Sequence, residues 1–83
     1  MHNVSITESA KKELAGIPEP FNRQIAGKMR GLADNPFPSG VKKLKGGDAY
    51  RIRSGDFRIL YTVAGNNVVI RAIGNRKDIY RRS

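Results

Sequence analysis

Hydrophobic residues recur along this chain with two different periods, and the period changes near residue 40. Between residues 8 and 33 they recur every three or four positions, which is typical of helices with one buried face. After Gly40, apolar and polar residues alternate, which is typical of strands with one buried face. The pattern therefore predicts a helical segment followed by a sheet of consecutive strands.

The N-terminal part predicts a short strand and a helical hairpin. Alternation over residues 3–6 favours a strand, and Thr7 is a residue type that caps helix starts. We expect the first helix to begin near Glu8 and to end at Pro18, because proline cannot continue a helix. A second helix follows from about Pro20. Its apolar stripe is predicted to contain Phe21, Ile25, Met29 and Leu32.

Three longer strands are predicted at residues 49–53, 57–63 and 68–73, because turn-forming residues that include Gly55 and Gly65 separate them. Consecutive antiparallel strands leave a sheet with one apolar face, which only the helical hairpin can cover. The predicted fold is a single α+β domain over residues 1–83. It consists of an N-terminal strand, a helical hairpin and an antiparallel β-meander of about four strands. The helices are expected to pack on one sheet face and to leave a basic, concave face open.

Composition excludes several classes of protein. The chain has no cysteine, which excludes a disulfide framework, a thiolate zinc site and a cysteine nucleophile. Its N-terminus lacks the apolar region of a signal peptide. No run of about 18 apolar residues exists, so we expect no membrane span. These features together predict a cytoplasmic protein.

Positive charge is concentrated in the second half of the chain. The formal net charge is +9 at pH 7, and residues 41–83 hold eleven Lys and Arg against three acids. Residues 1–40 hold five basic residues against four acids. A basic half predicts a polyanionic partner, because contacts with phosphates supply most non-specific affinity for nucleic acids. The alternative is that the charge only keeps a basic protein in solution.

The sheet-forming half places arginines where they can act together. Arg51 and Arg53 alternate with apolar residues in one predicted strand, and Arg58 does so in the next. Antiparallel neighbours lie about 4.7–4.9 Å apart, so these side chains can converge on one phosphate. A guanidinium group stays charged, and its planar fork matches two phosphate oxygens. Tyr80, in the basic tail, is able to stack on an unpaired base.

Two stretches carry a resemblance to a known family. YRIRSGDFRILYTV (residues 50–63) and AIGNRKDIYRR (residues 72–82) resemble the C-terminal half of RelE-type toxins, within the RelE/ParE superfamily. The resemblance extends over nearly the whole chain. It implies a toxin of a type II toxin–antitoxin system that enters the ribosomal A site and cleaves mRNA. Cleavage in this family proceeds by attack of a ribose 2′-OH on the adjacent phosphate.

The resemblance also implies roles for single residues. Arg58 would hold the scissile phosphate, and Arg76 would assist the leaving oxygen. Tyr80 would stack on the substrate nucleotide and orient it. The implied catalytic residues are Arg51, Arg53, Arg58, Arg76 and Tyr80. The further basic residues expected to bind RNA are Lys42, Lys43, Lys45, Arg81 and Arg82.

Two positions depart from the family pattern. Some members have lysine on the first basic strand, and many have histidine where this chain has Asn75. Arginine does not readily lose its proton, so Arg53 is not expected to act as a general base. Electrostatic stabilisation and substrate positioning then become the main contributions to catalysis. We expect neither a metal nor another cofactor, because the acids of residues 41–83 are scattered.

The expected partners are the ribosome, mRNA and an acidic, RelB-like antitoxin that folds as it wraps the basic face. The alternatives are a ParE-like toxin that inhibits DNA gyrase without enzymatic activity, and an inactive RNA-binding relative. Single residues also have structural interpretations. Arg51 and Arg53 could protect an edge strand from aggregation, and Tyr80 could pack against the sheet. Arg81 and Arg82 could belong to a frayed tail.

Overall fold

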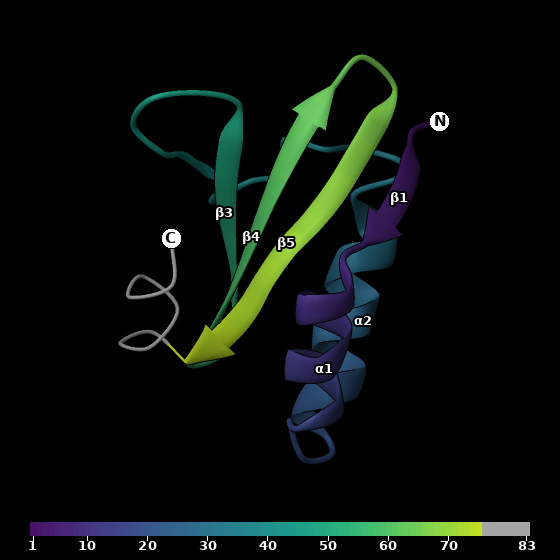
Figure 1. Ribbon diagram of the computed structural model, residues 1–83, viewed down its shortest axis with the longest axis vertical. Coiled ribbons are helices and arrows are strands. Elements are labelled where there is room, and N and C mark those ends of the chain that lie inside the picture. The colour runs from purple at the N-terminus through teal and green to yellow at the C-terminus, as the bar shows by residue number, and fades with distance from the viewer. Residues whose placement is uncertain (76–83) are drawn as a thin grey trace.

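The computed structural model describes residues 1–75 of the chain (Figure 1). Its elements are β1 (Asn3–Ile6), α1 (Glu8–Ala15), α2 (Phe21–Gly31), β2 (Lys42–Lys43), β3 (Ala49–Ser54), β4 (Phe57–Ala64) and β5 (Asn67–Asn75). The predicted α+β class and the order of the elements are confirmed. No helix in this part of the chain is long and apolar enough to cross a membrane.

Local sequence signals account for the helix boundaries. Thr7 caps α1, because its hydroxyl oxygen accepts a hydrogen bond from the Ala10 N–H at 3.2 Å. The helix ends at Ala15, before the expected proline, and the Gly16 N–H bonds back to helical carbonyls. The stripe predicted for α2 is confirmed at its centre, where Ile25 is fully buried.

The five strands form one mixed sheet in the order β1-β5-β4-β3-β2. The meander from β2 to β5 is antiparallel, as expected. β1 lies parallel to β5, with Asn3 opposite Asn67 and Ile6 opposite Ile70. Figure 1 shows both arrows pointing the same way, with α1 and α2 on one side of the sheet. The two helices thus connect β1 to the meander, and β4 is the central strand of the sheet.

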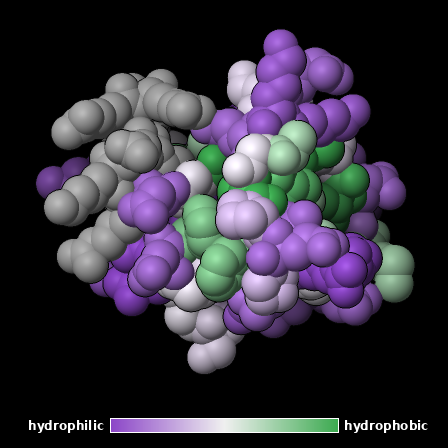
Figure 2. All heavy atoms as spheres, turned by 90° about the horizontal axis from the view of Figure 1, so that it is seen from below, coloured by the Kyte–Doolittle hydropathy of each residue, from purple (hydrophilic) through white to green (hydrophobic). Residues whose placement is uncertain are grey.

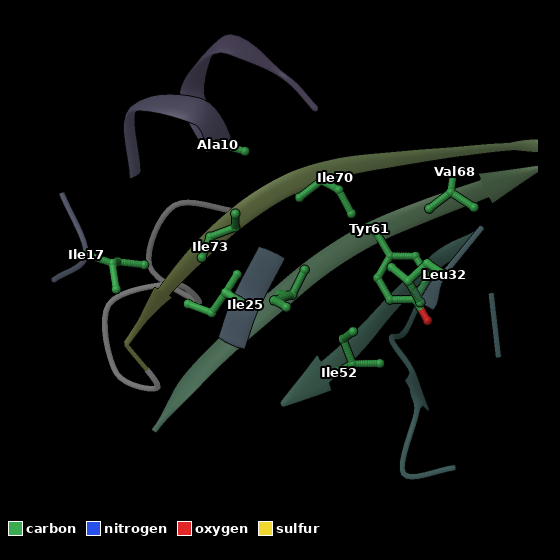
Figure 3. Close-up of a cluster of buried hydrophobic side chains, with 10 residues drawn as sticks. Ala10, Ile17, Ile25, Leu32, Ile52, Tyr61, Val68, Ile70 and Ile73 are labelled. Carbon is green, nitrogen blue, oxygen red and sulfur yellow. The ribbon is translucent and has the colours of Figure 1, made fainter. Parts of the chain in front are cut away.

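The core fills the space between the helices and one sheet face. Figure 3 shows side chains of β3, β4 and β5 gathered with those of the helical segment. Tyr61 is the largest fully buried side chain, and its hydroxyl donates to the Pro36 carbonyl at 2.6 Å. This bond ties the loop after α2 to the central strand. Burial, with a smaller contribution from Tyr50, raises the pKa of Tyr61 to about 12.

Helix α1 also protects the free edge of β5. β1 pairs only with residues 67–70, so the later backbone groups of β5 need other partners. The Glu13 carboxylate accepts a hydrogen bond from the Ile73 N–H at 3.0 Å. The Thr7 hydroxyl donates to the Arg71 carbonyl at 3.4 Å. Two side chains of the helical segment therefore hold the C-terminal half of β5 in place.

Hydrophilic residues cover most of the surface seen from below the helices, with a smaller area of hydrophobic residues between them (Figure 2). Over residues 1–75, the large hydrophobic side chains that remain exposed are Met1, Phe21 and Phe37. The ring of Phe21 still contacts Phe57, with centroids 5.7 Å apart. Most other large hydrophobic side chains of residues 1–75 are thus buried or partly buried.

Candidate functional site

The register of β3 and β4 gathers the predicted arginines on one face. Arg51 lies opposite Leu60, and Arg53 lies opposite Arg58. Side chains of directly opposed residues share a sheet face, so all three arginines point away from the helices. We call the surface formed by Arg51, Arg53, Arg58, Thr62 and Arg71 the arginine face. It lies on the side of the sheet that the sequence predicted to be basic.

Arg58 is far less accessible than a residue of an open face would be. Only 4% of its surface is exposed, whereas Arg53 is exposed. Leu60, on the same face, is 6% exposed. Within the predicted basic face, accessibility therefore differs from strand to strand: Arg58 on the central strand β4 is buried, and Arg53 on β3 is exposed.

No acidic side chain of residues 1–75 neutralises the charge of Arg58. Within residues 1–75, Arg58 makes no ion pair, and its buried Nε has no hydrogen-bond partner. Burying a charge without a partner is costly, and two like charges directly opposite each other destabilise a sheet. Unfavourable arrangements of this kind are expected mainly at functional sites. An anion between the guanidinium groups of Arg53 and Arg58 would supply the missing partner.

The three candidate lysines occupy different places. Lys42 lies opposite Arg51 across β2 and β3, on the arginine face. Lys43 lies opposite Tyr50, on the face that carries the core. Lys45 is exposed in the turn that follows β2. The fold therefore brings only Lys42 beside the arginines.

Four candidate residues, Arg76, Tyr80, Arg81 and Arg82, lie outside the described residues. The last described residue, Asn75, lies opposite Phe57 at the end of β5. No group of three histidine, cysteine or acidic residues that could hold a metal occurs in residues 1–75.

The sequence reasoning missed Arg71. The pairing of β4 with β5 shifts between Leu60 and Tyr61, so that Ile70 and Ala72 face consecutive residues of β4. Arg71 is the extra residue of this β-bulge. Its Nε donates to the Thr62 hydroxyl oxygen at 3.3 Å, which holds the side chain on the arginine face. The apolar residues Ile70 and Ile73, three positions apart in a strand of period two, are the signal that could have revealed the bulge.

A groove of about 690 Å³ lies beside the arginine face, at the outer edge of β3. β2 pairs only with Tyr50 and Arg51, so the rest of this edge has no strand partner among residues 1–75. The groove is lined by Gln24, Gly27, Lys28, Gly31, Asn35, Pro38, Ser39, Gly40, Ile52 and Arg53. It combines small and apolar side chains with two cations, which suits an extended or helical segment that carries acids.

The architecture described above, an α+β fold with two helices and a five-stranded mixed sheet, matches that of RelE structures. Residues 4–80 match the family described as the ParE toxin of the type II toxin–antitoxin system, parDE. The chain belongs to this family.

Individual relatives agree with the family match. A protein of Methanocaldococcus jannaschii, provisionally named toxin RelE1, is 33% identical and covers 95% of this chain and 94% of its own. In the archaeal RelE–RelB complex from Pyrococcus horikoshii OT3, one chain aligns with a TM-score of 0.82 and 28% identity. That alignment covers 93% of this chain and 97% of the other.

The RelB–RelE antitoxin–toxin complex from Methanococcus jannaschii gives a TM-score of 0.75 and 27% identity, over 93% and 95% of the two chains. The resemblance found in the sequence is therefore confirmed. The protein is a RelE-like toxin of the type II toxin–antitoxin class.

Proposed function

We propose that this toxin is a ribosome-dependent endoribonuclease. It cleaves mRNA in the ribosomal A site by attack of a ribose 2′-OH on the adjacent phosphate, and thereby stops translation. The observation that carries the proposal is the direct opposition of Arg53 and Arg58 on one sheet face, with Arg58 buried and without an acidic partner in residues 1–75. A substrate phosphate would supply the counter-ion that residues 1–75 do not provide for this pair.

The proposed chemistry uses charge rather than proton transfer by the arginines. As the 2′-oxygen bonds to phosphorus, negative charge grows on the non-bridging oxygens, and the bond to the 5′-oxygen breaks. Arg58 binds the scissile phosphate, and Arg53 stabilises the growing charge from the adjacent strand. Fixed donors aimed at developing charge are typically worth about 10²–10³ in rate. The 2′-OH gives its proton to water, and the upstream product carries a 2′,3′-cyclic phosphate. The 5′-oxygen leaves as an alkoxide and takes up a proton from water, so the downstream product carries a 5′-hydroxyl.

The ribosome is proposed to position the mRNA for attack. Arginine is a poor general base, and the sequence offers Asn75 where a histidine would supply an acid. Correct alignment of the attacking oxygen with the phosphate supplies a large part of the barrier reduction in such reactions. We propose that Arg76 assists the leaving oxygen and that Tyr80 stacks on the substrate nucleotide. The reaction takes place in the cytoplasm, where translating ribosomes are found.

The relatives in RelE–RelB complexes support an antitoxin as partner. We propose that an acidic antitoxin segment lies along the groove at the edge of β3 and reaches Arg53 with its carboxylates. Lys28 and Arg53, which both line the groove, supply the complementary charge. Binding would then block the site electrostatically and sterically, without a change of fold.

Mapping of mRNA 5′ ends in a cell-free translation reaction tests the proposed function. We expect new 5′-hydroxyl ends within translated codons, none in naked RNA, and their loss in Arg58→Ala and Arg76→Ala. Arg23→Ala is the matched control, because Arg23 is an exposed arginine on α2 that pairs with Glu19 at 2.9 Å. Intact mRNA under active translation would reject the proposal.

The ParE description of the matched family favours gyrase inhibition as the competing function. Such an inhibitor would reduce DNA supercoiling by gyrase and leave mRNA intact. A supercoiling assay with the same variants separates the two functions. Cleavage should also survive treatment of the toxin with a strong chelator before it is added to magnesium-containing ribosomes. Loss of activity specific to the treated toxin would contradict the metal-independent mechanism.

A further inference from the structure

Arg71 lies on the same face as Arg53 and Arg58 but at a different position along the sheet. Its guanidinium is bonded at Thr62, which is four residues further along β4 than Arg58. At about 3.4 Å per residue, the two positions are roughly 14 Å apart along the strand. One phosphate group cannot bridge that distance, so Arg71 would contact a different part of any bound strand.

A β-bulge and two hydrogen bonds fix the position of Arg71. The β-bulge turns this extra residue onto the arginine face, and the Thr7 hydroxyl bonds to its backbone carbonyl. Thr62 accepts only from Nε, which leaves the two terminal nitrogens of the fork available. No carboxylate of residues 1–75 forms an ion pair with Arg71.

We propose that Arg71 is a second phosphate-binding residue, which holds the RNA backbone at a phosphate other than the scissile one. Thr62 orients it through the hydrogen bond to Nε. This inference rests on the proposed ribonuclease function, and it aligns the bound strand with β4. Because the contact forms equally in the ground state and the transition state, it contributes to binding and not to the chemical step.

Two measurements with one set of variants test the proposal. The first is binding of a labelled single-stranded RNA with 2′-O-methyl riboses, which cannot be cleaved, at several salt concentrations. Loss of one phosphate contact in Arg71→Ala should weaken binding and reduce the slope of log K against log salt by about 0.7. Arg71→Lys should keep the slope, because it keeps the charge. Thr62→Val should keep the slope but weaken binding by about twofold, because the fork is less well oriented.

The second measurement is cleavage on programmed ribosomes, with melting temperatures recorded for every variant. We expect Arg71→Ala to raise KM about fivefold and to leave kcat within about twofold, as loss of uniform binding requires. Arg23→Ala is the control arginine and should change neither the slope nor KM.

The outcomes separate this inference from the proposed function. If the wild-type protein cleaves but Arg71→Ala behaves like Arg23→Ala, the second phosphate contact is wrong. If the wild-type protein binds RNA with the expected change of slope but cleaves nothing, the contact stands and the ribonuclease proposal fails. Absence of RNA binding by the wild-type protein would overturn both. A changed melting temperature with an unchanged slope would assign Arg71 a structural role and overturn the inference.

Discussion

Arg53 on β3 and Arg58 on β4 lie directly opposite each other on the same sheet face. Cβ atoms in such pairs are about 4.5–5.5 Å apart, and like charges at this distance repel each other. The repulsion is strongest where water is excluded, and Arg58 is 4% exposed. The fold thus maintains a locally unfavourable charge pair, which a bound phosphate would make favourable.

Replacing Arg58 should separate stability from function. Arg58→Met keeps the length of the side chain but removes the buried charge, so we expect the free energy of unfolding to rise by about 1 kcal/mol. We expect cleavage to fall by at least about 10²-fold, because the phosphate loses its main ligand. Urea unfolding and mRNA end mapping measure the two effects. A variant destabilised by more than about 1 kcal/mol would show that Arg58 stabilises the fold.

A small polyanion should stabilise the free protein through the same pair. Inorganic pyrophosphate at about 100 times its dissociation constant would raise the free energy of unfolding by about 2.7 kcal/mol. The stabilisation should be much smaller in Arg53→Gln and Arg58→Gln, since each substitution removes one guanidinium group. Thermal unfolding at fixed ionic strength measures it, with Arg23→Gln as the control. Equal stabilisation of all four proteins would place the anion elsewhere.

Tyr61 should make stability depend on pH above 10. Its pKa is about 12 in the folded protein and about 10 when unfolded, so folding favours the protonated hydroxyl. The associated stability is fully present below pH 10 and is lost as pH rises through 12. We expect the free energy of unfolding of the wild-type protein to exceed that of Tyr61→Phe by about 1–2 kcal/mol at pH 8, because phenylalanine leaves the Pro36 carbonyl unpaired.

The difference in free energy of unfolding between the wild-type protein and Tyr61→Phe should decrease as pH rises from 10 to 12. The decrease should be on the order of 2–3 kcal/mol at full ionisation of Tyr61. Urea unfolding of both proteins across this range isolates Tyr61, because the other titrating groups are common to both. A difference that stays constant up to pH 12 would show that the Tyr61 hydroxyl is not buried.

Glu13 should stabilise the end of β5. Its carboxylate accepts the Ile73 N–H at 3.0 Å, on an edge that β1 does not reach. Glu13→Ala leaves a backbone donor unpaired and should cost about 1–3 kcal/mol. Glu13→Gln keeps an acceptor oxygen and should recover at least half of that loss. Hydrogen exchange at the Ile73 amide gives the local readout. Unchanged protection in Glu13→Ala would mean that water replaces the carboxylate.

Local patterns were sufficient to predict most elements of the fold. Thr7, Gly55 and Gly65 mark boundaries because a cap and a turn depend only on nearby backbone groups. The alternation of arginines with apolar residues predicted which side chains share a face, because a strand has a period of two. The period of the strands therefore identifies the candidate arginines of β3 and β4 without knowledge of how the strands pair.

Tertiary structure decided the features that give the site its properties. The register that sets Arg53 against Arg58, the parallel pairing of β1 with β5 and the bulge at Arg71 all depend on partners distant in sequence. Arg58 is buried on the central strand β4 only once the whole sheet is assembled. Periodicity reports the geometry of one segment, whereas register and burial depend on the summed contacts of all segments. The sequence by itself determined the class of protein and the basic face, and only the assembled sheet decided which charges meet there.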